Sequence, residues 1–221
     1  EMTAVRADGT EISASRNSAE EAARSRAETF NRRFEKWAED SDFEKAVQSA
    51  REDLASHRES GQAWADGYEE ELSFSAWQTG HLVSIAANYY SDTGGAHPNT
   101  ALLSWNFDLD TGEFVTPLLL AEDDQAFLDG VREEILRQAE QTARENGRSP
   151  QEYYLENYER IAAEWASYAV SFDGDGMHVG FSPYEIACYA VGPQVFTVGY
   201  EALSPWLSDS GRQVLGLDPV K

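Results

Sequence analysis

The chain has 221 residues, of which 17 are basic and 40 are acidic, giving a formal net charge of −23 at pH 7. Its 41% hydrophobic and 12% aromatic residues are typical of a folded globular protein and exclude a disordered chain. The negative electrostatic field of such a chain repels phosphate backbones and anionic lipids, so we expect it to contact neither nucleic acid nor a membrane. A cationic protein or ligand is the better match, although the acidic residues could equally serve solubility alone.

Residues 18 to 59 have the apolar periodicity of helices. Apolar residues recur there at steps of three and four, which places them on one helical face. Two pairs with capping-box spacing, Ser18 with Glu21 and Ser41 with Glu44, precede the two parts of this pattern. We therefore expect two amphipathic helices, or one helix with a kink, divided at the segment AEDSD.

Between residues 70 and 116 the apolar period changes from 3.6 to 2, which predicts an antiparallel meander. The loop SDTGGAHPN separates the second strand from the third, and the turn DTG closes the third strand onto a short fourth around Phe114. The alternating apolar residues of the first and third strands are Leu72, Phe74 and Ala76, and Leu103, Trp105, Phe107 and Leu109.

The second half begins with another helix, which ends at Gly147 because a C-terminal cap favours a residue that accepts positive φ. The segment from Ser149 to Glu152 combines a capping box with Pro150 at the first helical position and predicts a further helix. The apolar faces of these two helices are formed by Leu128, Val131, Ile135, Ala139 and Ala143, and by Tyr154, Tyr158, Ile161 and Trp165.

Strands dominate the last third. The segments SYAVSF and MHVGFSP flank DGDG as a hairpin, QVFTVGY is another strand, and EALSPWL is a short helix. The predicted order is helices followed by strands, and it occurs twice along the chain. This order indicates an α+β fold with an antiparallel sheet packed against several amphipathic helices. We expect two halves, residues 1–116 and 117–221, in one integrated globule, because no linker separates them.

Motifs for catalysis or metal binding are missing from the sequence. Its four histidines form no HExxH or HxH pattern, and neither a nucleophile elbow nor a phosphate-binding loop occurs. The alternating aspartates of DGDG could bind calcium through their carboxylates. In an EF-hand loop that starts at Asp173, however, Tyr184 occupies the position that requires glutamate. The one cysteine, Cys188, has apolar neighbours and is predicted to be a buried, inert thiol. We expect no metal and no cofactor, and a hydrolase using scattered carboxylates is a minor alternative.

Two stretches, NYYSDTGGAHPN and FSPYEIACYAVGP, combine tyrosine with glycine and proline. Such loops suit a protein interface, because tyrosine buries a large area with few rotatable bonds. The alternative is that the glycines and prolines only shape turns and that the tyrosines belong to the core.

The same two stretches, with WNFDLDTGEFVT between them, resemble the extracytoplasmic domain of the RsiV-like family, which also occurs beside the deacetylase domain of PdaC. The sequence departs from the family where Cys188 replaces a usual proline. The resemblance implies an α+β, non-catalytic envelope domain, secreted or held outside a membrane, with lysozyme as partner. The opening EMTAVRADGT has no signal-peptide pattern, so we expect any anchor to lie upstream of residue 1.

From the resemblance we expect an extracytoplasmic binding domain for a cationic protein such as lysozyme, and binding that weakens as salt rises. A module that binds cell-wall glycan through aromatic faces is the alternative. Within the loop, His97 is expected to make a structural hydrogen bond. The expected contact residues are Tyr89, Tyr90, His97, Pro98, Tyr184, Glu185 and Tyr189.

Overall fold

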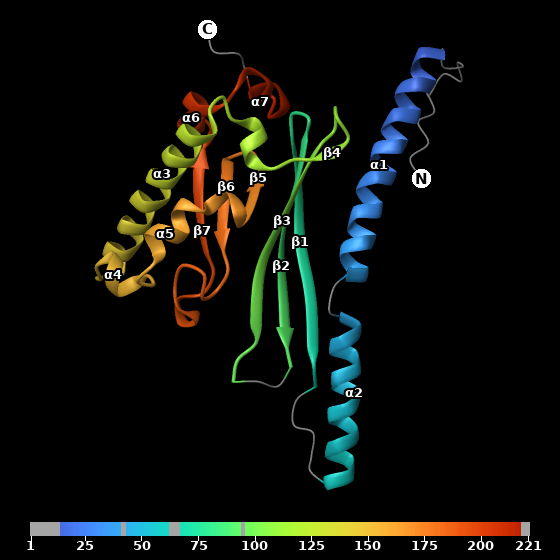
Figure 1. Cartoon of the computed structure of the whole chain (residues 1–221), viewed down its shortest axis with the longest axis vertical. Helices are drawn as coiled ribbons and strands as arrows, with labels where there is room; N and C mark the ends of the chain where they lie inside the picture. Colours follow the sequence, from blue (N-terminus) through green and yellow to red (C-terminus); the bar gives the residue numbers. More distant parts are fainter. Residues whose placement is uncertain (1–13, 41–42, 62–66, 94–95, 218–221) are drawn as a thin grey trace.

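The computed structural model describes residues 14–40, 43–61, 67–93 and 96–217. Two helices open the described chain, α1 (Ala14–Asp40) and α2 (Phe43–Ser60), which confirms the division predicted at AEDSD (Figure 1). Ser18 lies inside α1 and does not begin it, so the first predicted capping box is wrong. Ser41 of the second box lies outside the described residues.

The predicted meander is present as a four-stranded antiparallel sheet in the order β1-β2-β3-β4. Its first turn packs closely against the segment after α7 (Asp209–Val214), since a Cβ on Gly80 would lie 2.3 Å from the backbone nitrogen of Gly216. With φ at +59°, this position also favours glycine. The four strands are β1 (Glu69–Thr79), β2 (Leu82–Asp92), β3 (Asn99–Asp108) and β4 (Glu113–Phe114).

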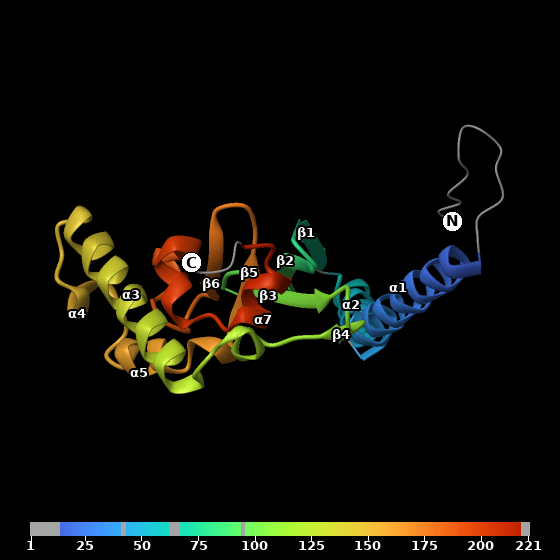
Figure 2. The ribbon, with the colours of Figure 1, turned by 90° about the horizontal axis from the view of Figure 1, so that it is seen from above.

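Helix α1 packs against one face of this sheet. The Phe30 ring contacts Phe107 edge-on at 5.4 Å and stacks on Phe114 at 5.8 Å, measured between ring centroids. Arg26 donates hydrogen bonds to the backbone carbonyls of Leu109 and Asp110. The N-terminal helices and the second half of the chain therefore lie on opposite sides of the meander (Figure 2).

The second half forms a three-stranded antiparallel sheet in the order β5-β6-β7, covered by the long helix α3. The α+β prediction is thus confirmed, with two antiparallel sheets instead of one, and DGDG is the predicted hairpin turn. The further elements are η1 (Pro117–Leu120), α3 (Asp124–Glu145), α4 (Pro150–Tyr153), α5 (Tyr158–Ala163), η2 (Trp165–Ser167), β5 (Ala169–Phe172), β6 (Gly176–Phe181), η3 (Tyr189–Val191), β7 (Gln194–Gly199), α6 (Tyr200–Leu203), η4 (Ser204–Trp206) and α7 (Asp209–Val214).

The helix predicted to run through Tyr154 to Trp165 is broken into α4, α5 and η2. Tyr154 forms a β-bridge with Ala187, and the Leu155 N–H donates to the Ile186 carbonyl at 3.0 Å. These long-range backbone hydrogen bonds replace helical ones, which local periodicity cannot reveal. The terminal helix expected in EALSPWL is present as α6 and η4, whereas α7 was not predicted.

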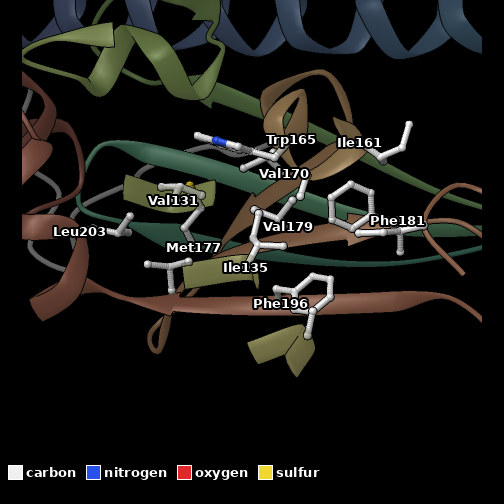
Figure 3. Close-up of a cluster of buried hydrophobic side chains, with 14 of the residues drawn as sticks. Val131, Ile135, Ile161, Trp165, Val170, Met177, Val179, Phe181, Phe196 and Leu203 are labelled. Atoms are coloured by element: carbon white, nitrogen blue, oxygen red, sulfur yellow. The ribbon is translucent and has the colours of Figure 1, made fainter. Parts of the chain in front are cut away.

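The main core lies between α3, α5 and the inner face of the second sheet (Figure 3). Trp165 is fully buried at its centre, packs edge-on against Phe127 at 5.4 Å, and donates its indole N–H to the Leu128 carbonyl at 3.1 Å. Burial of a side chain of this size without an unpaired donor contributes strongly to stability. The core therefore fixes the second sheet, whose loops carry half of the site described below.

A buried polar cluster joins the two sheets. Ser84 donates to the Asn106 side-chain oxygen at 2.7 Å and accepts the N–H of Phe172 at 2.7 Å. Asn106 donates its amide to the Val170 carbonyl at 2.8 Å, and the Val170 N–H donates to Ser104 at 2.8 Å. We call Ser84, Ser104 and Asn106 the inter-sheet joint. It holds the open edge of β5 against the face of β2 and β3.

Candidate functional site

The loops after β2 and β6 point to the same end of the molecule (Figure 1) and bring together four aromatic side chains. His97 stacks on Tyr189 with ring centroids 3.9 Å apart and lies 5.9 Å from the Tyr184 ring. Tyr184 and Tyr189 are stacked at 5.8 Å, and Tyr90 lies near Tyr189. We call Tyr90, His97, Tyr184 and Tyr189 the tyrosine cluster. It combines residues that are about 90 positions apart in the sequence.

His97 is held by two hydrogen bonds that define its neutral tautomer. Its Nδ1 lies 3.0 Å from the Pro98 carbonyl, which can only accept, so Nδ1 carries the proton. Its Nε2 then accepts from the Tyr184 hydroxyl at 3.0 Å. The hydrogen bond expected of His97 is therefore present, and it connects the two predicted motifs.

Tyr184 has a backbone conformation that tyrosine rarely adopts. Its φ is +70°, and no other non-glycine residue among those described has a positive φ. The Tyr184 N–H donates to the Ala187 carbonyl at 2.9 Å, and the Glu185 carboxylate accepts the N–H of Ser182, which keeps the turn closed. A left-handed non-glycine residue costs about 1–3 kcal/mol. The side chain held in this way is 57% exposed.

Acidic side chains border the cluster. Strand pairing sets Glu71 opposite Tyr90 and Glu69 opposite Asp92, so these residues share one face of the sheet. Desolvation raises the pKa of Tyr90, and the nearby charges of Asp92, Glu69 and Glu71 raise it further. We call Glu69, Glu71 and Asp92 the acidic rim. A cationic group approaching the tyrosines would meet this negative charge.

The structure does not bring all seven predicted contact residues together. Tyr89 projects from the opposite face of β2, where its hydroxyl donates to Glu70. Glu185 holds the turn through Ser182, so its carboxylate is not free for a partner. Pro98 contributes the carbonyl that orients His97. The acidic rim was not predicted, although the run of three glutamates at the start of β1 was a visible signal.

Cys188 is exposed, so the prediction of a buried thiol is wrong. It caps the N-terminus of η3, where the chain turns at the surface between the buried Ala187 and the half-buried Tyr189. Apolar neighbours in the sequence do not bury a residue that points outward from a turn. Its position beside Tyr189 places a thiol at the border of the tyrosine cluster.

A second group of polar side chains lies between the sheets, beside a cavity of about 220 Å³. Nε2 of His178 lies 2.8 Å from the Asp173 carboxylate, and its Nδ1 lies 2.9 Å from the Thr197 hydroxyl. Nδ1 makes a hydrogen bond and Nε2 lies at ion-pair distance from Asp173 without a regular hydrogen bond, so these contacts connect the β5–β6 hairpin to β7. Among the described residues, no group of three histidine, cysteine or acidic side chains could hold a metal ion.

None of the described helices is long and apolar enough to span a membrane. Comparison with curated proteins gave no match. Residues 119–201 match the model of a family described as "Protein of unknown function (DUF3298)". This range includes Tyr184 and Tyr189 but not Tyr90 or His97.

Two solved structures resemble the fold. A DUF3298 family member from Bacteroides fragilis is 16% identical, has a TM-score of 0.54, and is aligned over 77% of this chain and 66% of its own length. A DUF3298 family protein from Pseudomonas aeruginosa is 18% identical, has a TM-score of 0.50, and is aligned over 72% of this chain and 71% of its own length. Similarity at these identities concerns the fold alone. Residues 119–201 thus match the DUF3298 family model, and the fold resembles those of two DUF3298 family structures.

Proposed function

We propose that this chain is a non-catalytic, extracytoplasmic binding domain of the bacterial envelope whose tyrosine cluster docks a cationic protein, with lysozyme as the first candidate. The observation that carries the proposal is Tyr184, an exposed ring held at a strained φ of +70°. Backbone strain concentrates at functional sites, because surrounding contacts must maintain it against an easier conformation. The resemblance of the two tyrosine motifs to RsiV-like domains selects lysozyme among cationic proteins.

The cluster has the properties of a binding hot spot. Tyrosine is enriched at such sites because a rigid ring buries area with little loss of conformational entropy. The hydrogen bond between His97 and Tyr184 limits the movement of the exposed ring before binding. The acidic rim adds long-range attraction for a basic partner, which chiefly raises the association rate.

Replacing Tyr184 and Tyr189 together with alanine tests the proposal. We expect the affinity for lysozyme to fall at least about 30-fold, since truncation of a hot-spot residue costs about 2 kcal/mol or more. Leu119→Ala is the matched control, because this side chain is 64% exposed and lies outside the cluster. Unchanged affinity of the double variant, with an intact circular dichroism spectrum, would refute the proposal.

A second candidate ligand is cell-wall glycan. The stacked, partly exposed rings of Tyr184 and Tyr189 could pack against sugar faces. Sedimentation of the chain with insoluble peptidoglycan, with and without lysozyme, separates the two candidates. Cosedimentation without lysozyme favours the glycan, whereas cosedimentation that requires lysozyme favours the protein partner.

A further inference from the structure

Two of the sheet edges in the described structure are hydrogen-bonded to other groups, and a third is very short. The edge of β7 is capped by Gln138, whose amide donates to the Thr197 carbonyl at 2.7 Å and accepts the Thr197 N–H at 3.2 Å. The edge of β5 is satisfied by the inter-sheet joint, which bonds backbone groups of Val170 and Phe172. The edge strand β4 has only two residues and offers little backbone to a further strand. These are ordinary means of preventing unwanted strand pairing.

The outer edge of β1 has none of these protections. The strand has eleven residues, contains no lysine, arginine or proline, and pairs with β2 one to one without a bulge. None of the backbone–backbone hydrogen bonds outside the described helices and strands involves β1, and Figure 2 shows no described element beyond this edge. Three of its side chains are exposed apolar groups, Leu72 at 37%, Phe74 at 67% and Trp77 at 37%. A long, regular, apolar edge is a template for a further strand.

We propose that β1 pairs with β1 of a second copy of this chain, antiparallel and centred on Phe74. In this register Phe74 faces its own symmetry mate, Glu71 lies opposite Trp77, and Glu69 lies opposite Thr79. No carboxylate faces another, because the three glutamates occupy one end of the strand and Trp77 to Thr79 the other. Like charges directly opposite each other would destabilise a pair, and this register avoids that penalty.

The pairing would join the two meanders into one continuous sheet of eight strands. Eleven residues at about 3.4 Å each give an overlap of roughly 37 Å, with every outer backbone group of β1 offered a partner. A two-fold interface of this kind is closed, so it ends at the dimer and does not propagate. It uses the strand edge, which includes Glu69 and Glu71 of the acidic rim, and none of the side chains of the tyrosine cluster.

Salt distinguishes this dimer from the proposed partner binding. Two copies with a net charge of −23 repel each other, and salt screens that repulsion beyond a Debye length of about 8 Å at physiological ionic strength. Self-association should therefore strengthen as salt rises, whereas binding of a cationic protein should weaken. Failure of either proposal leaves the other unaffected.

Analytical ultracentrifugation of the full chain over a concentration series tests the dimer. We expect a reversible monomer–dimer equilibrium whose dissociation constant falls with added salt. Phe74→Lys should abolish the dimer, because it sets two positive charges opposite each other at the centre. Val195→Lys is the matched control, since this exposed residue lies on β7 and should leave the dimer intact. A chain that stays monomeric at all concentrations, or a dimer insensitive to Phe74→Lys, would overturn the proposal.

Cysteine cross-linking tests the register. In a Cys188→Ser background, Phe74→Cys should form a disulfide-linked dimer under mild oxidation, because the two side chains meet on the symmetry axis. Ala76→Cys is the control, since Ala76 lies opposite Leu72 of the second copy. Equal cross-linking of the two variants would contradict the proposed register.

Discussion

Replacing Asn106 with leucine should destabilise the whole domain, because it opens the inter-sheet joint. Asn106 is 6% exposed, accepts a hydrogen bond from Ser84, and donates one to the Val170 carbonyl. Leucine has a similar size but makes neither bond, so the Ser84 hydroxyl and the Val170 carbonyl each lose a hydrogen-bond partner. Each unsatisfied group costs about 1–3 kcal/mol, which gives an expected loss of about 2–6 kcal/mol in the free energy of unfolding.

Urea denaturation followed by tryptophan fluorescence and by circular dichroism measures this loss. The matched control is Asn88→Leu on the neighbouring strand, because Asn88 is exposed and its side chain takes no part in the joint. The control should change the free energy of unfolding by no more than about 0.5 kcal/mol. A loss for Asn106→Leu as small as that of the control would refute the role given to the joint.

Three further changes test other parts of the account. Burial raises the pKa of Asp173, but hydrogen bonds, chiefly from His178, outweigh burial and hold the pKa below its usual range. Asp173→Asn should therefore lower the melting temperature at pH 7, and this difference should shrink as the pH falls below the ordinary aspartate pKa of about 3.9. Gly130→Ala should destabilise by about 1–3 kcal/mol in urea, because its Cβ would lie 2.2 Å from the Trp206 ring. Tyr184→Gly should keep the melting temperature while weakening lysozyme binding, since glycine accepts the φ of +70° without strain.

Local patterns predicted much of the fold. The period-two alternation identified the meander, DGDG identified the β5–β6 hairpin, and the Ser149 segment identified the start of α4, where the Ser149 N–H donates to Glu152 at 2.9 Å. These features depend on residues close together in the sequence. The break after Tyr153 depends instead on backbone pairing with a loop more than thirty residues later, which no local pattern contains.

Only part of the candidate site could be predicted, because local patterns do not show which distant residues meet. The two tyrosine motifs were visible in the sequence, but only the fold shows that His97 meets Tyr184 and Tyr189 while Tyr89 turns away. Strand alternation could have separated Tyr89 from Tyr90, since neighbouring residues of a strand point to opposite faces. The inter-sheet joint was missed because Asn106, a polar residue between two aromatic ones, had the pattern of an exposed strand face.

Calorimetric titration of the full chain with lysozyme at low and at physiological salt tests the central claim most directly. We predict saturable binding whose affinity falls as salt rises, because the acidic rim attracts a cationic partner. The same titration with Tyr184→Gly should show much weaker binding with the fold intact. No binding at low salt, or binding unaffected by both salt and Tyr184→Gly, would contradict the claim that the tyrosine cluster docks this partner.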